Sequence, residues 1–127
     1  MKASFAYDRT YFPAFPGLDL TITGTETGQQ QTVWGLIDSG SDATQIPLRM
    51  LRAIKARKLD QRWVQDLSGV RYPVTIYSVQ LDINSLILYG IEAIGRESIN
   101  EVIIGRDVLN QLVVTLNGLA HTTEISD

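Results

Sequence analysis

The sequence predicts a mainly β domain, closed and barrel-like, with two short helices, and three observations lead to this prediction. Apolar and polar residues alternate in several stretches of the 127-residue chain, and turn-forming Gly, Asn and Ser residues separate these stretches. Apolar residues at helical spacing occur in only two brief segments. The length suits one hydrophobic core, and no repeat or linker divides the chain, so residues 1–127 are expected to form a single domain.

Composition excludes several classes of protein. Hydrophobic residues make up 44% of the chain and charged residues 20%, as in an ordinary soluble globule. The chain has no cysteine, which excludes disulfides and thiolate metal sites. No apolar run approaches the roughly 18–20 residues that a membrane span needs, and residues 1–5 lack the apolar core of a signal peptide. We therefore expect a cytoplasmic protein with no membrane partner.

The net charge of −3 argues against a nucleic-acid partner, although the basic residues are unevenly distributed. Six of the 11 lie in one short segment: Arg49, Arg52, Lys55, Arg57, Lys58 and Arg62. This segment could bind nucleic acid or an acidic substrate, or it could be the solvated face of an amphipathic helix that Pro47 opens. The second interpretation is favoured, because exposed charged faces are the rule for surface helices.

The first part of the chain predicts a strand pair that ends at an acid. Residues 1–17 contain Pro13 and Pro16 and are expected to run along an edge. Residues 18–23 alternate as a strand, residues 24–28 form a turn, and residues 30–37 return as the partner strand. Asp38 follows directly at the end of this hairpin.

The rest of the chain predicts further strands and two hairpins. A hairpin is expected at 61–76, with its tip at Ser68-Gly69, and a C-terminal hairpin at 113–127, turning at Asn117-Gly118. The remaining expected elements are strands 72–83, 86–94 and 102–104, a loop at 95–98 and a helix of about two turns at 106–112.

Two stretches combine a buried strand with a sudden break. In residues 33–44 an apolar run stops at Asp38, which Ser39 and Gly40 follow; in residues 102–109 another apolar strand breaks at a glycine before a short helical pattern. Asp-Ser-Gly alone is most often an ordinary turn. The two breaks together, in this order, form a more specific pattern.

Residues 36–44 followed by residues 103–109 resemble the retropepsin-type aspartic proteases, and the likeness extends in element order from about Leu18 to about Gly118. The resemblance implies a single-domain retropepsin-like fold and an aspartic endopeptidase that works as a homodimer on an extended polypeptide, without a cofactor. It implies that Asp38 is the catalytic acid and base, that the Ser39 hydroxyl cross-links the two loops, and that Gly40 permits a close backbone approach.

The resemblance also implies roles for two further groups of residues. Arg106 would pair with Asp42 and fix the second helix against the catalytic loop. The hairpin at 61–76 would be the flap over the cleft, with the substrate-contacting residues Leu67, Ser68, Gly69 and Val70.

The chemistry of an acid pair requires a second copy of the chain. One carboxylate must be ionised to take a proton from water while the other is protonated, which happens when two like charges lie about 3 Å apart. No other aspartate in the chain is followed by Ser-Gly or Thr-Gly. One chain thus supplies half a site, and Asp38 of a second copy must complete it across a two-fold axis.

Other functions fit less well or remain open. A serine hydrolase would need a histidine near Ser39 or Ser41, but the single histidine is His121, and no nucleophile-elbow motif is present. Metal-ligand spacing is also absent, so we expect no metal site. A non-catalytic dimeric scaffold or peptide-binding module on the same fold remains the alternative. The intact Asp38-Ser39-Gly40 favours catalysis.

Overall fold

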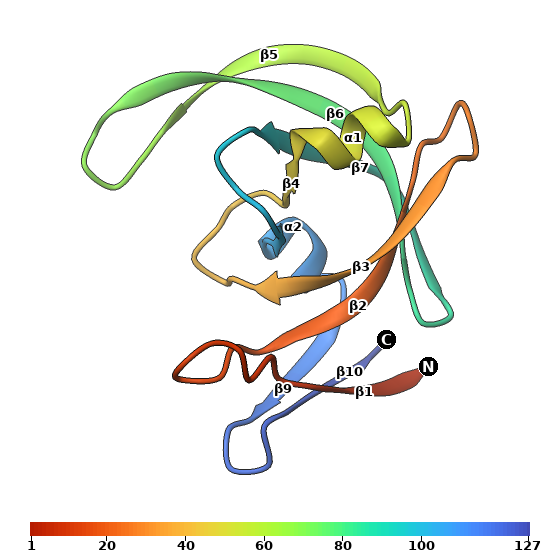
Figure 1. Ribbon diagram of the computed structural model, residues 1–127, viewed down its shortest axis with the longest axis vertical. Helices are drawn as coiled ribbons and strands as arrows, with labels where there is room; N and C mark the ends of the chain where they lie inside the picture. The colour runs from red at the N-terminus through yellow and green to blue at the C-terminus, as the bar shows by residue number, and fades with distance from the viewer.

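The computed structural model describes all residues, Met1–Asp127, as strands joined by short loops with two short helices (Figure 1). The elements in chain order are β1 (Lys2–Ala6), β2 (Gly17–Thr23), β3 (Gln30–Ile37), β4 (Gln45–Pro47), α1 (Leu48–Ala53), β5 (Arg57–Gln65), β6 (Arg71–Ile83), β7 (Leu86–Arg96), β8 (Val102–Ile104), α2 (Arg106–Leu109), β9 (Val113–Asn117) and β10 (Thr122–Ser126). Neither helix is long and apolar enough to cross a membrane.

A closed ring of strands forms the body of the molecule. The strands pair in the order β2-β3-β8-β4-β7-β6, and β6 returns to β2 through the pairs from Thr21↔Asp82 to Thr23↔Gln80. The pairs β3–β8 and β4–β7 are parallel, and the other neighbours are antiparallel. The prediction of a mainly β, barrel-like fold with two short helices is confirmed.

The core fills this ring through the alternation of its strands. Leu18, Leu20 and Ile22 of β2 are completely or almost completely buried, as are Val79, Leu81 and Ile83 of β6. Successive side chains of a strand point to opposite faces, so each strand contributes every second residue to the interior. Leu51 brings α1 into the same core.

A second sheet, in the order β1-β10-β9, lies below the barrel in Figure 1. The N-terminal segment, expected at an edge, supplies the edge strand β1, which pairs with β10 from Lys2↔Ser126 to Ala6↔Thr122. The two termini therefore meet, and the Met1 amino group donates a hydrogen bond to Asp127 Oδ1 at 2.7 Å.

The long hairpin β5–β6 arches away from the barrel (Figure 1). β5 pairs only with β6, from Arg57↔Ser78 to Gln65↔Arg71, and nearly all its residues are exposed. The hairpin expected at 61–76 is the outer part of this longer one. Its sequence alternation was weaker over residues 57–60, where basic residues interrupt it.

Three other expectations are corrected, and one strand was not foreseen. The helix expected at 106–112 spans only Arg106–Leu109, because the amides of Gln111 and Leu112 bond three residues back and β9 begins directly afterwards. Asn117-Gly118 is not a two-residue turn: Asn117 pairs with Thr122, so a four-residue loop joins β9 to β10. The short strand β4 was not expected. The loop expected at 95–98 begins later, because β7 continues to Arg96.

The core position of β8 gives a test of the fold. Ile104→Ala removes most of a completely buried side chain, and we expect the free energy of unfolding to fall by about 2–5 kcal/mol because the cavity cannot fully collapse. Urea denaturation measures the loss. The matched control is Ile103→Ala on the opposite, half-exposed face of β8, which should cost clearly less. Equal losses would contradict this placement.

Candidate active site

The two sequence breaks lie side by side because β3 and β8 are parallel neighbours. Their register runs from Gly35↔Val102 to Ile37↔Ile104, so both strands end at the same edge. The Asp38 amide donates to the Ile104 carbonyl at 3.0 Å, which extends the pairing by one residue. The chain thus brings Asp38 and Gly105 together although 67 positions separate them in sequence.

Asp38 begins a tight turn with one carboxylate oxygen engaged. Its Oδ1 accepts a hydrogen bond from the Gly40 amide at 2.9 Å, and its carbonyl accepts one from the Ser41 amide at 3.1 Å. Asp38 is half buried, whereas Ser39 and Gly40 are exposed. Oδ2 of Asp38 and the Ser39 hydroxyl receive or make no hydrogen bond within the chain, so both are available to a partner or to substrate.

Thr44 and Asp107 anchor this turn from beneath. The Thr44 amide and hydroxyl donate to the Asp107 carboxylate at 3.1 and 2.8 Å, and the completely buried hydroxyl also accepts from the Gly105 amide at 3.2 Å. Asp107 accepts from the Val108 amide at 2.9 Å as well, at the start of α2. These bonds tie the loop after β3 to the loop after β8.

Gly105 permits the close approach of the two loops. A Cβ at this position would lie 2.6 Å from the Ala43 carbonyl carbon and oxygen and 2.9 Å from the Ser41 carbonyl oxygen. All three atoms belong to the backbone, so no side chain could move aside to make room. The glycine break in the second motif is therefore explained by packing against the first.

Arg106 contacts the Asp38 turn at two points. Its Nη1 donates to the Ser39 carbonyl at 2.7 Å, and its Nη2 bonds Asp42 Oδ1. The Asp42 side chain is 91% exposed and that of Arg106 43%, so the ion pair contributes at most about 1 kcal/mol in the single chain. The bond to the Ser39 carbonyl carries more of the positioning.

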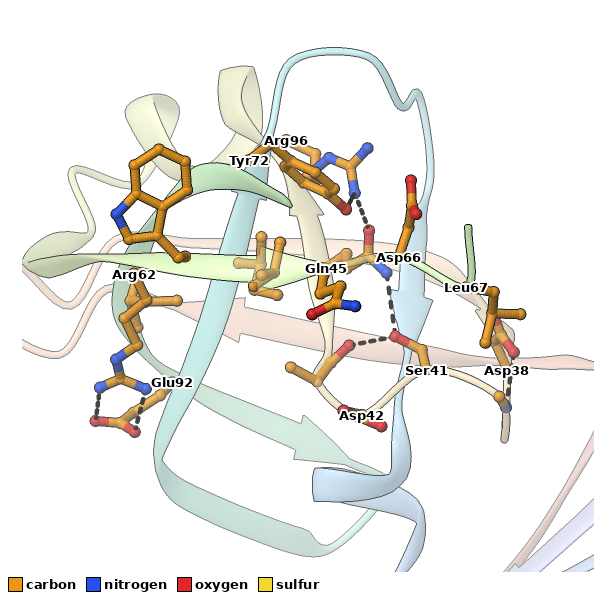
Figure 2. A pocket seen from close by; sticks show the side chains of 17 residues that line it. Asp38, Ser41, Asp42, Gln45, Arg62, Asp66, Leu67, Tyr72, Glu92 and Arg96 are labelled. Carbon is orange, nitrogen blue, oxygen red and sulfur yellow. Dashed lines mark hydrogen bonds and ion pairs between the residues drawn. The ribbon is translucent and has the colours of Figure 1, made fainter. Parts of the chain in front are cut away.

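A cleft of about 480 Å³ separates the Asp38 turn from the β5–β6 hairpin (Figure 2). Asp38 and Gln45 line the cleft from the barrel, and Trp63 and Leu67 line it from the hairpin. Of the expected flap residues, Leu67 lines the cleft, whereas Ser68, Gly69 and Val70 do not. No group of His, Asp and Glu side chains in the chain is arranged to hold a metal ion.

The hairpin tip is a turn held by Asp66. Its Oδ1 accepts from the Ser68 hydroxyl at 2.6 Å and from the amides of Ser68 and Val70 at 2.9 and 3.0 Å. The hydroxyl bond, with the amide bonds behind it, lowers the pKa of Asp66 from its usual 3.8. Because the pKa of Asp66 is lower in the folded protein than in the unfolded chain, these bonds stabilise the fold fully at pH values above the unfolded pKa. The stabilisation is lost as the pH falls through the folded pKa.

Polar side chains line two further parts of the cleft (Figure 2). Arg62 of the hairpin bonds Glu92 of β7 at 3.3 and 3.4 Å. Elsewhere Arg96 Nη1 donates to Gln45 Oε1 at 2.9 Å, and Gln45 Nε2 donates to Ser41 Oγ at 3.1 Å.

Sequence reasoning did not identify Gln45, Arg96 or Asp107 as site residues. Gln45 and Arg96 meet only because β4 and β7 pair in parallel, with Pro47 opposite Arg96. No local pattern signals that contact. Asp107 lies inside the second motif, and its place directly after Gly105-Arg106 was a usable signal for an acidic side chain in the first turn of a helix.

Comparisons with solved structures place this geometry in a known fold. A retropepsin-like aspartic protease from Rickettsia conorii superposes with a TM-score of 0.66 and 6% identity, covering 100% of this chain and 94% of that one. EIAV protease, complexed with the inhibitor HBY-793, superposes with a TM-score of 0.57 and 17% identity, covering 84% of this chain and 93% of that one. The chain therefore has the retropepsin-like fold.

Other comparisons add little. A protein of unknown function from Legionella pneumophila reaches a TM-score of only 0.45 at 10% identity, over 76% of this chain and 86% of that one. No family model matches the sequence, and no curated protein matches it closely.

Two buried threonines give a matched test of the loop anchor. Thr44→Val removes a hydroxyl that bonds Asp107 and Gly105, and we expect the free energy of unfolding to fall by about 1–3 kcal/mol. Thr123 is equally buried, but its hydroxyl has no hydrogen-bond partner in the protein. Thr123→Val should thus be neutral or slightly stabilising. Urea denaturation of both variants distinguishes the two cases, and equal effects would contradict the anchoring role.

Proposed function

We propose that this protein is an aspartic endopeptidase whose active site forms between two copies of the chain, each supplying Asp38. The observation that carries the proposal is the state of the Asp38 carboxylate. One oxygen is held by the Gly40 amide, the other is unbonded, and the side chain lines an open cleft beneath a projecting hairpin. This arrangement lies at the meeting point of two loops in a retropepsin-like fold.

The mechanism follows from bringing two such carboxylates together. At about 3 Å they cannot both ionise cheaply, so the pair holds one proton. The ionised member removes a proton from a water molecule that attacks the peptide carbonyl, and the protonated member donates to the carbonyl oxygen, which gives a tetrahedral gem-diol. The first member then donates the proton it took to the amide nitrogen as the C–N bond breaks, while the second takes a proton back from a gem-diol hydroxyl. An amine and a carboxylic acid leave, and the pair again holds one proton. The Gly40 amide keeps each carboxylate oriented, and Arg106 holds the turn through the Ser39 carbonyl.

Features of the single chain support a homodimer built at this edge. The Ser39 hydroxyl is exposed and unbonded, as a group that cross-links two symmetric loops would be. The Asp42–Arg106 pair gains strength only where a partner excludes water from it. At the hairpin tip, Leu67 is fully exposed and Val70 is 57% exposed, and a partner or substrate would cover this apolar surface.

The substrate fits as an extended polypeptide between the turn and the hairpin. The outer half of the hairpin pairs only with itself, so it can move without breaking the closed ring. Its opening would admit a chain, and its closure would exclude bulk solvent while the attacking water molecule stays between the two carboxyl groups. In this proposal the β5–β6 hairpin is the flap.

Substitution of the proposed catalytic acid tests the activity directly. We expect Asp38→Asn to lower the rate of cleavage of an unfolded polypeptide by at least about 100-fold, because the pair can no longer provide a general base. The control is Asp19→Asn, the same chemical change at an exposed residue of β2, which should keep activity. Sedimentation must show that the variants fold and dimerise as the wild type does.

The same assay separates the alternative function. Binding of polypeptide by the wild type without any cleavage would contradict proteolysis and favour a peptide-binding module on this fold. A strictly monomeric protein that cleaves polypeptide would contradict the shared site.

The pH dependence of the rate gives a second test. A pair that must hold one proton produces a bell-shaped profile with two apparent pKa values that belong to the pair. We expect the maximum on the acid side of neutrality, with activity falling roughly tenfold for each pH unit beyond the upper pKa. A cleavage rate that does not change between about pH 4 and pH 8 would contradict the acid pair.

A further inference from the structure

The cleft contains one cation that no carboxylate neutralises. Arg62 lies 3.3 Å from Glu92 and 3.2 Å from Asp60, and Asp42 is paired with Arg106. Arg96 also lines the cleft, but it forms no ion pair. Its neighbour Glu97 lies 3.9 Å from the guanidinium of Arg52.

Neutral groups hold the Arg96 side chain in a defined position (Figure 2). Nη1 donates to Gln45 Oε1 at 2.9 Å, Nη2 reaches Ser98 Oγ at 3.4 Å, and the guanidinium lies over the Tyr72 ring at 5.5 Å from its centroid. Arg96 is half buried. These contacts orient the fork but leave its charge uncompensated, with donors still free.

A short chain of hydrogen bonds connects Arg96 to the Asp38 turn. Gln45 accepts from Arg96 and donates to Ser41 Oγ at 3.1 Å, and the Ser41 amide donates to the Asp38 carbonyl at 3.1 Å. A side chain of a bound polypeptide would therefore meet the guanidinium while a nearby peptide bond lies at Asp38.

We infer that Arg96 forms a subsite that selects polypeptide substrates with an aspartate or glutamate side chain near the scissile bond. The inference rests on the proposed function and names the substrate class for it. A carboxylate accepts two parallel N–H donors from an arginine fork, and it would supply the ion-pair partner that Arg96 lacks. A lysine or apolar side chain in this subsite would leave the half-buried cation unpaired.

Symmetry extends the inference to both sides of the scissile bond. Two copies related by a two-fold axis place one Arg96 in each half of the cleft. Acidic residues should therefore be accepted at the equivalent positions before and after the cleaved bond. Asp38 and Asp66 also line the cleft, so the preference should be confined to these positions and not extend to acidic peptides in general.

Matched peptides test the selection. One extended peptide cleaved by the wild-type dimer is varied position by position between Glu and Gln, and kcat/KM is measured for each pair. At the subsite position we expect the Glu peptide to be favoured by about tenfold or more. In Arg96→Gln this ratio should fall to near one. Arg62→Gln removes the same charge from the same cleft, but from a paired residue, so it should keep the ratio.

A charge-reversal variant distinguishes loss of the subsite from a general distortion of the cleft. Arg96→Glu should reverse the preference and favour a Lys peptide over the Glu peptide. The subsite would be overturned if the wild type showed no preference for the Glu peptide, or if Arg96→Gln kept that preference. Loss of the preference in both Arg96→Gln and Arg62→Gln would also overturn it.

Binding separates failure of the subsite from failure of the proposed activity. The Asp38→Asn protein should bind the same labelled peptides without cleaving them. The ratio of its affinities for the Glu and Gln peptides is measured with Arg96 intact and again in a double variant that also carries Arg96→Gln. A wild type that cleaves none of the peptides, while Asp38→Asn shows the Arg96-dependent ratio, would overturn proteolysis but support the acidic subsite. Binding without that ratio would overturn the subsite.

Discussion

The parallel pairing of β3 with β8 is the constraint on which the site depends. These strands are central members of the ring, and their last hydrogen bond joins the Asp38 amide to the Ile104 carbonyl. Beyond that bond, the chain after β3 leaves the sheet as the Asp38 turn, and the chain after β8 enters α2. The turn is ordered because Thr44 and Asp107 connect it to the start of α2, and because Gly105 lets the two backbones touch. A buried ring thus presents a half-buried carboxylate in a defined orientation.

Charged and polar side chains are bonded differently on the two sides of the cleft, which are the barrel and the β5–β6 hairpin. On the barrel side, consecutive hydrogen bonds link Arg96 to Gln45 and Gln45 to Ser41. On the hairpin, Asp66 is satisfied within its own turn, and Arg62 reaches across to Glu92 of β7. That pair is exposed and therefore weak. Across the cleft, this pair ties the hairpin to the barrel only weakly, whereas the barrel side is linked by consecutive hydrogen bonds.

The parts of the fold that could be predicted were those with a local signal. The alternation of residues 18–23, the apolar run before Asp38 and the strand before Gly105 all depend on burial of neighbouring residues, and all three strands are confirmed. β4 carries too few residues to show a period. The second helix was predicted too long, because its apolar spacing continues into a turn that tertiary pairing pulls into β9.

The candidate site divides in the same way. Asp38, Ser39, Gly40, Asp42 and Arg106 were named from two motifs, and the structure brings them together in one turn and its support. The expected flap residues lie on the β5–β6 hairpin, and of these Leu67 lines the cleft whereas Ser68, Gly69 and Val70 do not; their role as a flap stays a prediction. Their position depends on how far the two strands of the hairpin extend, and the weak alternation over residues 57–60 did not show this length. Arg96 could not be found, because only the β4–β7 register brings it to Gln45.

The basic residues of β5 acquire a physical meaning from the pairing of the strands. A closed ring has no free edge, but β5 lies outside the ring and pairs with β6 alone. Its outer row of amides and carbonyls is a template on which another chain could polymerise. Arg57, Lys58 and Arg62 lie along this strand; Arg57 and Arg62 form ion pairs with Glu26, Asp60 and Glu92, so the charged groups at this edge are of both signs. Half of the basic residues that could have marked a nucleic-acid patch thus lie on a strand with an unpaired edge, where charged side chains disfavour edge-to-edge pairing of two copies.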